Sequence, residues 1–281
     1  MTLDPTTLTA RQVYQYLAAA VAPRPICFAS TVDAEGNRNL SPYSFFNVVS
    51  GDPPLLAFAP LLSGRDGSRK DTLNNVTVVP EVVINVVSHA MVQQMSLAST
   101  AYPSATDEFV KAGFTPVAGE AVRPARVAEA LVAFECTVDR VIALGDGPMA
   151  GNLILARVVR IHVADEIVVG DDGIDHRALD LVGRMGGEDY IRAVPEALFT
   201  VPKPSRPFGI GVDALPAAVR NSRILTGNDL GQLGNQPRLP TAAELAEVMA
   251  FGSEEERHRM AREQIRVGNP NLALATLLAA G

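Results

Sequence analysis

The first part of the chain carries hydrophobic residues at helical spacing. Apolar side chains recur every three or four positions over residues 8–21, which predicts an amphipathic helix. Pro23 and Pro25 follow, so the helix is expected to end before them. Its apolar positions are Val13, Tyr16, Leu17, Ala20 and Val21.

After this helix the hydrophobic pattern becomes typical of β-strands. Residues 26–32 and 38–49 are apolar runs that flank the short segment 33–37. Within that segment Gly36 and Asn37 tolerate the positive φ that a hairpin loop needs. We therefore expect a strand, a turn and a second strand.

Further apolar runs, bounded by prolines or glycines, continue the series. Strands are predicted over 55–59 and 82–87, with a short helix over 68–78 between them. Two longer β-patterned runs, 131–144 and 152–163, are joined by a Gly-Asp-Gly-Pro turn. The alternation of strands and helices expected of a βαβ series is absent, so the pattern predicts a mainly β fold, a β-barrel with peripheral helices.

The chain from about residue 205 differs from what precedes it. Thr241 with Glu244, and Ser253 with Glu256, have the spacing of a capping box, so a helix is expected to begin at each. A last apolar helix should follow Gly268. We therefore divide the chain into a barrel domain, 1–204, and a helical C-terminal extension, 205–281. Because its apolar helix faces need burial, extra dimer contact is the simplest role for the extension.

Composition and charge exclude several classes of partner. The chain has 281 residues, of which 47% are hydrophobic and 20% charged, and its formal net charge is -7. Nucleic acids and anionic membranes attract a dense cationic face, which an acidic chain does not offer. We expect neither as a partner, so an anionic ligand must meet a local positive cluster.

The cysteines and the N-terminus indicate the cell compartment. Cys27 and Cys136 are the only cysteines, and each lies in an apolar run, so neither a disulfide framework nor a zinc site is expected. The first residues lack the basic region of a signal peptide, and the apolar run 17–22 is too short for a membrane span. These features favour a soluble cytoplasmic protein with buried, reduced thiols.

Cations gather where the short helix should begin. Arg65, Arg69 and Lys70 lie close together and are interleaved with Ser63, Ser68 and Thr72. A phosphate there could accept hydroxyl and amide hydrogen bonds at a positive helix end. A solvated surface loop would have the same composition, so both interpretations stay open.

Polar residues recur every three positions beside an aromatic pair. Ser41, Ser44, Asn47 and Ser50 could offer hydrogen bonds to a ligand, and Phe45 and Phe46 could offer ring faces to a planar group. An edge strand with outward polar residues and a buried Phe pair explains the pattern equally well.

Other chemistries find little support in the sequence. The Gly-Ile-Gly run at 209–211 resembles a dinucleotide loop, but no strand precedes it and Pro216 interrupts the helix that should follow. The four histidines are scattered, so no metal site is expected, and no nucleophile elbow or catalytic triad spacing occurs. The catalytic residues therefore stay unassigned, and any chemistry should come from a bound cofactor.

Short motifs along residues 10–204 together resemble the flavin reductase-like, flavoredoxin-type family. Their order and spacing carry the resemblance. The motifs are Arg24-Pro25-Ile26, Ser30 to Asp33 with Gly36, Asn39, Pro42 to Asn47, Asp52-Pro53-Pro54, Lys70-Asp71-Thr72 with Asn75, Glu81 to Asn85, and Gly186 to Tyr190.

The resemblance implies an FMN-binding split β-barrel, a homodimer, and reduction of flavin by NADH or NADPH. It places Ser30 and Thr31 near the flavin, and Ser44, Phe45, Phe46 and Asn47 along its ribityl chain and ring. Arg69, Lys70 and Thr72 would surround the phosphate. With Ser50 and Arg65 from the residue patterns above, these are the candidate cofactor-binding residues.

Three functions stay open at this point. The first is an NAD(P)H:flavin oxidoreductase, which would reduce FMN by hydride transfer to N5 and could serve a flavin-dependent monooxygenase partner. The second is an FMN-binding electron carrier that does not turn over NAD(P)H. The third is a flavin-dependent reductase of a small organic substrate, with a pocket reshaped by the insert 101–108 and the helical extension.

Overall fold

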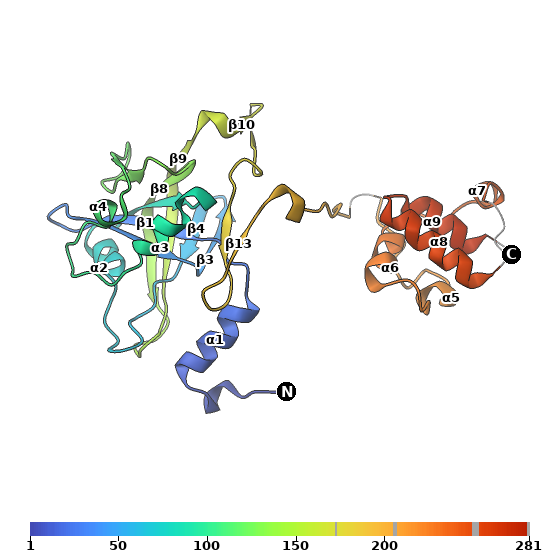
Figure 1. Cartoon of the computed structure of the whole chain (residues 1–281), viewed down its shortest axis with the longest axis horizontal. Helices are drawn as coiled ribbons and strands as arrows, with labels where there is room; N and C mark the ends of the chain where they lie inside the picture. The colour runs from blue at the N-terminus through green and yellow to red at the C-terminus, as the bar shows by residue number, and fades with distance from the viewer. Residues whose placement is uncertain (172, 205–206, 249–252, 280–281) are drawn as a thin grey trace. The chain divides into compact units, whose positions relative to one another are not determined.

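The computed structural model describes residues 1–171, 173–204, 207–248 and 253–279 (Figure 1). The chain divides into two compact units, Met1–Phe199 and Thr200–Gly281. The division expected from the sequence, at 204–205, stays a prediction as an assignment of domains. Among the described residues, no helix combines the length and the apolar character that a membrane span requires.

A seven-stranded antiparallel sheet forms the body of the first unit, in the order β2-β1-β5-β8-β9-β4-β3. β-Branched and apolar runs bounded by Gly and Pro form these strands, as the pattern predicts. The strands are β1 (Cys27–Val32), β2 (Arg38–Tyr43), β3 (Phe46–Gly51), β4 (Pro54–Phe58), β5 (Glu81–Val86), β8 (Val132–Ala143) and β9 (Asn152–Val163).

The connection between β2 and β3 closes the sheet. These strands lie at opposite edges of the sheet order, yet only Ser44 and Phe45 stand between them in the chain. The three Cα–Cα steps from Tyr43 to Phe46 span about 11 Å at full extension. The two edges must therefore approach each other, which curls the sheet into a split barrel. The predicted mainly β barrel with peripheral helices is confirmed, whereas the single strand expected over 38–49 is two strands that meet at this corner.

Helices and short strand pairs surround the barrel. Lys70 precedes the first turn of α2, and Asp107 caps α4 by accepting the Phe109 N–H at 2.9 Å. The helices are α1 (Ala10–Ala20), α2 (Asp71–Val78), α3 (Val92–Leu97) and α4 (Glu108–Ala112), with short 3₁₀ turns η1 (Pro5–Thr7), η2 (His89–Met91), η3 (Asp165–Ile167) and η4 (Pro195–Ala197). The strand pairs are β6 (Pro116–Val117) with β7 (Arg126–Val127), β10 (Val168–Val169) with β11 (Gly173–Ile174), and β12 (Val182–Arg184) with β13 (Tyr190–Arg192).

Strand β1 is buried on both faces, which explains its apolar sequence. Cys27 and Ala29 join one hydrophobic cluster with Phe58 and Ile154, and Phe28 joins a second cluster on the opposite face with residues of α3 and α4. The strand period of two therefore distributes side chains between two cores. Both cysteines are buried free thiols, as expected, and this burial raises the pKa of the Cys27 thiol and raises that of Cys136 to about 12.

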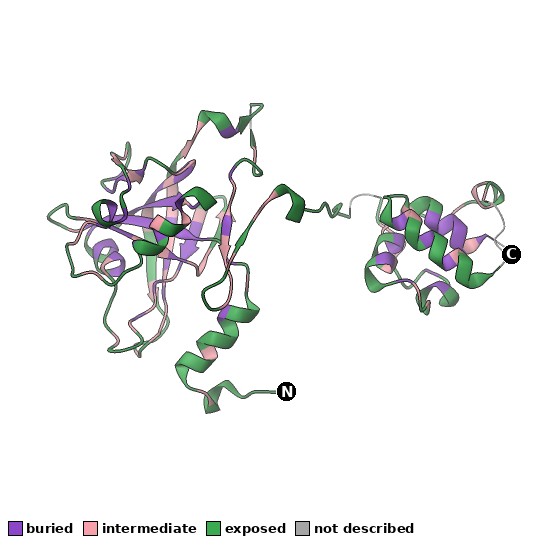
Figure 2. Ribbon diagram, viewed as in Figure 1, coloured by how far each residue is buried: buried purple, intermediate pink, exposed green. Residues whose placement is uncertain are grey.

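The second unit is helical and has its own core. Both predicted capping boxes are present, at Thr241 with Glu244 and at Ser253 with Glu256. Leu233, Ala261, Leu274 and their neighbours pack into one cluster, so α8 and α9 bury faces against each other (Figure 2). The helices are α5 (Ala217–Arg220), α6 (Gly227–Gly234), α7 (Ala242–Ala246), α8 (Glu254–Arg266) and α9 (Pro270–Leu278).

Candidate functional site

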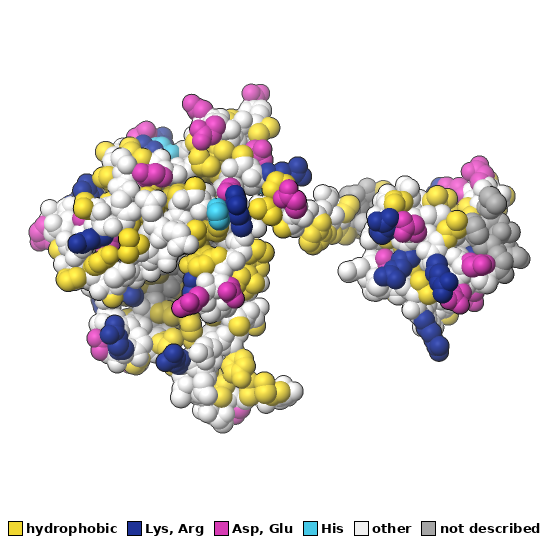
Figure 3. All heavy atoms as spheres, viewed as in Figure 1, with side chains coloured by type: hydrophobic (Ala, Val, Ile, Leu, Met, Phe, Trp, Pro, Cys, Tyr) yellow, Lys and Arg dark blue, Asp and Glu magenta, His cyan; other side chains and the backbone are white. Residues whose placement is uncertain are grey.

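A cavity of about 1110 Å³ opens on the first unit. Its walls come from α1, from β2, from the loop before α2, from the segment 98–104 and from the β12–β13 hairpin. Figure 3 shows this face of the unit hollowed beside α1, with apolar side chains inside and charged ones at the rim. With Glu108 of α4 and Met149 of the β8–β9 turn, which also line the cavity, segments that are distant in sequence thus meet at one site.

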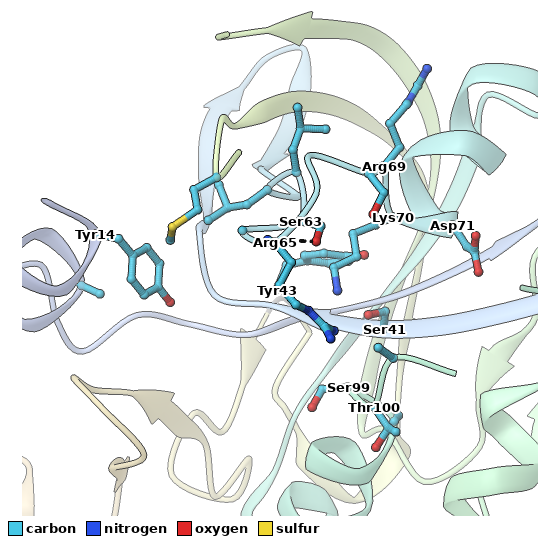
Figure 4. A pocket seen from close by; sticks show the side chains of 18 of the residues that line it. Tyr14, Ser41, Tyr43, Ser63, Arg65, Arg69, Lys70, Asp71, Ser99 and Thr100 are labelled. Atoms are coloured by element: carbon cyan, nitrogen blue, oxygen red, sulfur yellow. Dashed lines mark hydrogen bonds between the residues drawn. The ribbon is translucent and has the colours of Figure 1, made fainter. Parts of the chain in front are cut away.

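Two cations enter the cavity from the loop before α2. In Figure 4 the side chains of Arg65 and Lys70 extend toward Ser41 and Tyr43 of β2, while Ser99 and Thr100 lie across from them. Among the described residues, neither cation forms an ion pair or a side-chain hydrogen bond. Their charges are therefore available to an anionic ligand.

The loop that carries Arg65 is held by its own hydrogen bonds. The carboxylate of Asp66 accepts the Ser68 hydroxyl at 2.7 Å and the Ser68 N–H at 3.1 Å. Hydrogen bonds from the Ser63 and Ser68 side chains hold the pKa of this exposed carboxyl well below its usual range. The Arg65 N–H donates to Ser63 Oγ at 3.3 Å (Figure 4). The loop is therefore shaped before any ligand arrives.

Arg69 also lines the cavity, but its guanidinium points away from Lys70 (Figure 4). Its Nη2 donates to Thr77 Oγ1 at 2.9 Å and to the Leu73 carbonyl at 3.4 Å, along the flank of α2. Figure 4 shows its guanidinium pointing away from Lys70 and Tyr43. Arg65, not Arg69, is thus the companion of Lys70 in this arrangement, although all three remain candidate residues.

Thr31 and Thr72 lie behind the cavity wall in a buried polar network. Thr31 Oγ1 accepts from Nδ2 of Asn39 at 3.1 Å and from Nδ2 of Asn75 at 3.0 Å, and Asn39 Nδ2 also donates to Thr72 Oγ1 at 2.9 Å. Ser30 is completely buried, and its hydroxyl has no hydrogen-bond partner in the described structure. The network joins β1, β2 and α2 and holds Asn39 in the wall, while a direct contact of these hydroxyls with a cofactor stays a prediction.

The side chains at the β2–β3 corner and along β3 lie in different surroundings. Ser44 accepts from Arg24 Nε at 3.3 Å, and Phe45 packs on Tyr14 with ring centroids 6.0 Å apart. Phe46 packs against the barrel core, Asn47 is exposed, and Ser50 lies beside a register shift of β3. Of this group only Ser44 lines a cavity.

A second cavity of about 890 Å³ adjoins the first. The two cavities share Tyr14, Tyr43, Ser99 and Arg184. The guanidinium carbon of Arg184 lies 4.6 Å from the centroid of the Tyr190 ring, and its Nη2 donates to the Gly187 carbonyl at 2.5 Å. Arg184 has no carboxylate partner among the described residues. The two cavities therefore offer two adjacent binding sites that share these four residues.

Arg192, which also lines the second cavity, is neutralised. Asp180 accepts from its Nε at 2.7 Å and from its Nη2 at 2.8 Å. This paired hydrogen bonding lowers the pKa of Asp180 and raises that of Arg192. Arg184 is thus the cation of this cavity whose charge is uncompensated.

Sequence reasoning missed several cavity residues. Tyr43 lines both cavities, and burial raises its pKa to about 12. Its place between Ser41 and Ser44, in a strand expected to meet a ligand, was the available signal. Glu108 and Arg184 had none, because only the fold brings α4 and the β12–β13 hairpin to β2.

The donor set of the cavity suits an anionic organic molecule. Among the described residues, no group of three or more His, Cys, Asp or Glu is placed to hold a metal ion. Hydroxyls, cations without an ion pair such as Arg65 and Lys70, and the Tyr43 ring line the first cavity instead. Such a set fits FMN, whose phosphate needs cations and whose flat ring needs an apolar or aromatic wall.

Comparison with known proteins identifies relatives of the first unit. The model of the flavin reductase like domain family matches residues 20–173. A protein of Halalkalibacterium halodurans is 37% identical over 194 residues, which cover 68% of this chain and 91% of that protein. A protein of Aquifex aeolicus is 34% identical over 190 residues, covering 67% of this chain and 94% of that protein. Both relatives are described as uncharacterised.

Solved structures with the same fold carry more informative names. The nitrilotriacetate monooxygenase component B from Bacillus cereus is 30% identical, with a TM-score of 0.67, over 72% of this chain and 98% of that chain. The 2-nitrobenzoate 2-nitroreductase of Pseudomonas fluorescens is 26% identical, with a TM-score of 0.63, over 73% of this chain and 100% of that chain. A flavin reductase with a split barrel domain from Shewanella frigidimarina, 21% identical with a TM-score of 0.61 over 72% of this chain and 99% of that chain, supports the fold.

Proposed function

Because the chain belongs to the flavin reductase-like family, we propose that it is an FMN-binding oxidoreductase that reduces flavin with NADH or NADPH. The observation that carries the proposal is that Arg65 and Lys70, two cations without an ion pair among the described residues, point into one cavity (Figure 4). The positions of Arg65 and Lys70 beside each other suit the phosphate of FMN (Figure 4).

Each wall of the cavity has a role in this proposal. Arg65 and Lys70 bind the phosphate, assisted by the amides at the start of α2. Tyr43 offers a ring face to the isoalloxazine, and the segment 98–104 covers the site and limits the access of water. When bound, FMN supplies the hydride acceptor that the protein side chains lack. The residues then act by position and charge rather than as general acids or bases.

The second cavity gives the other reactant access to the flavin. Tyr43 and Ser99 stand in both cavities, so a ring placed against them is reached from either side. Arg184 offers a positive charge to an anionic reactant there, which both nicotinamide nucleotides are. Binding both reactants side by side lowers the barrier by proximity.

The proposal is tested by flavin titration and by NADH oxidation with the full-length protein. We expect FMN to bind and NADH to be oxidised steadily when free flavin is added. Lys70→Ala should weaken FMN binding by roughly tenfold while leaving riboflavin, which has no phosphate, nearly unchanged. Arg157→Ala is the matched control, since its guanidinium pairs with Asp139 and Arg157 does not line the cavity. Equal FMN affinity in wild type and Lys70→Ala would overturn the phosphate assignment.

Direct reduction of an organic anion is the second candidate function. The second cavity and Arg184 favour it, as does the similarity to a 2-nitrobenzoate 2-nitroreductase. A nitroaromatic carboxylate would then be consumed with NADH in the absence of added flavin, and Arg184→Met would raise its KM. A protein that binds FMN without oxidising NADH would instead be an electron carrier.

A homodimer forms part of the proposal. Helix α1 buries Ala18 alone, and Tyr16, Leu17 and Val21 are exposed. An apolar helix face of this kind is typical of a subunit interface. Sedimentation or size-exclusion measurements should give a dimer, and Leu17→Glu should shift it toward monomer.

Two further expectations belong to the same proposal. A monooxygenase partner is supported by the similarity to a monooxygenase component B, and a cytoplasmic location by the two buried free cysteines. Release of reduced flavin in the NADH assay would favour a monooxygenase partner, and retention would argue against one.

A further inference from the structure

We infer that Glu108 is a specificity-determining residue, which accepts hydrogen bonds from the ribityl hydroxyls of the flavin. The inference rests on the proposed function of the first cavity. Glu108 opens α4 and lines that cavity, and only 7% of its surface is exposed. No feature of the sequence placed this carboxylate at the site.

One oxygen of Glu108 is occupied by the barrel. Its Oε2 accepts the Leu40 N–H at 2.9 Å. The residues on either side of Leu40, Asn39 and Ser41, line the same cavity. The carboxylate is therefore seated at the cavity wall formed by β2.

The charge of Glu108 is not compensated. In the described part of the chain, no side chain donates a hydrogen bond to it and no cation forms an ion pair with it. Its charged neighbours, Asp71 and Asp107, have the same sign; with burial as the larger cause, they raise the pKa of Glu108. Asp107 has its own partner, Arg38, at 2.7 Å. Because the Leu40 N–H donates to Oε2 alone, a ligand that supplies further donors would stabilise this buried carboxylate.

The chemistry of the group selects the ligand atoms. An ionised carboxylate accepts hydrogen bonds but donates none, so it favours hydroxyls and repels phosphate. The charge of Asp71 acts on Glu108, and Asp71 directly follows Lys70 in the chain. Glu108 therefore lies toward the end of the cavity where Lys70 would bind the phosphate. In FMN the ribityl chain joins the phosphate to the ring. Its hydroxyls are therefore the donors that come next to the Lys70 phosphate site.

This arrangement orients the ligand. Arg65 and Lys70 attract the phosphate, while Glu108 excludes it and accepts the sugar hydroxyls. The opposite charges along one wall then allow only one direction of binding.

The test compares Glu108→Gln with wild type in titrations with riboflavin and with lumiflavin, which lacks the ribityl hydroxyls. The amide oxygen of Gln can still accept the Leu40 N–H, so the contact with β2 is kept. We expect riboflavin affinity to fall about tenfold, as for loss of charge-assisted hydrogen bonds, with lumiflavin affinity unchanged. An equal loss for both ligands, or no loss for either, would overturn the inference.

Glu129→Gln is the matched control. Its carboxylate also accepts a backbone N–H, that of Thr115 at 3.1 Å, but it is exposed and does not line the cavity. We expect no change for either ligand in this variant.

A measurement on wild type alone guards against a variant that fails to fold. Riboflavin should bind more tightly than lumiflavin, and equal affinities would refute the role of Glu108. A wild-type protein that binds no flavin at all would instead refute the proposed function of the cavity.

Discussion

The two units of the chain differ in the cations that line their cavities. In the second unit four arginines have carboxylate partners: Arg238 with Glu244, Arg259 with Glu255, Arg262 with Asp229 and Arg266 with Glu263. In the first unit Arg65, Lys70 and Arg184 reach cavities without such partners among the described residues. Paired surface charges contribute little beyond solubility, whereas unpaired charges in a cavity are available to a ligand.

The two units also differ in how many residues a helix buries. Helix α9 buries Ala273, Leu274, Ala275, Thr276 and Leu277, while α1 buries Ala18 alone. Helix α9 thus buries most of its apolar side chains inside the second unit, whereas α1 leaves most of its own exposed. The first unit leaves both charge and apolar surface unsatisfied, which is why we place binding and assembly there.

The largest expected effect is a loss of stability that is confined to the second unit. Leu274→Ala removes a core side chain that is 1% exposed, and should destabilise that unit by about 2–5 kcal/mol. Urea unfolding followed by circular dichroism measures the loss. FMN affinity should not change, and its disappearance would mean that the second unit contributes to the site.

The next effect concerns the buried network behind the cavity. Thr31→Val keeps the shape of the side chain but removes the acceptor of Asn39 and Asn75, and should cost about 1–3 kcal/mol in the first unit. Thermal unfolding of this unit is the measurement, with the half-buried Ser50→Ala as control. A variant of unchanged stability that binds FMN less tightly would show direct contact of Thr31 with the cofactor.

A matched pair of arginines tests the contrast in charge directly. Arg65→Ala should weaken FMN binding by roughly tenfold, whereas Arg238→Ala, which breaks a paired surface charge, should leave it unchanged. Isothermal titration with FMN distinguishes the two variants. Equal losses would mean that general electrostatics, and not a phosphate site, attracts the flavin.

A smaller effect is expected at the helix caps of the second unit. Ser253→Ala removes the acceptor of the Glu256 N–H at the start of α8, for a cost of about 1 kcal/mol. The denaturation midpoint of the second unit should fall while NADH oxidation stays constant. A change in activity would contradict the independence of the two units.

The smallest effect is a dependence of stability on pH. Because burial raises the pKa of Glu108 above its ordinary value of 4.5, the folded state holds this proton more tightly than the unfolded state. The resulting stabilisation is present below the ordinary pKa and is lost as pH rises through the raised one. Relative to wild type, Glu108→Gln should gain stability over that rise. Urea midpoints at several pH values measure it, and parallel curves would contradict the shift.

Local patterns in the sequence predicted most elements of the fold. The period of two identified the strands, the capping boxes identified the starts of α7 and α8, and the loop composition located the cations before α2. These features depend on a few neighbouring residues, so they can be recognised without the fold.

The site itself was determined by tertiary packing. Thr31 and Thr72 face a buried network, and Arg69 faces Thr77, because strand pairing and helix packing decide where a side chain points. Glu108 and Arg184 line the same cavity as Arg65 and Lys70 only because the fold brings α4 and the β12–β13 hairpin to this loop. The sequence by itself determined which elements form and which residues could bind an anion. Only the tertiary structure decided which of them share a cavity, because that depends on contacts between segments distant in the chain.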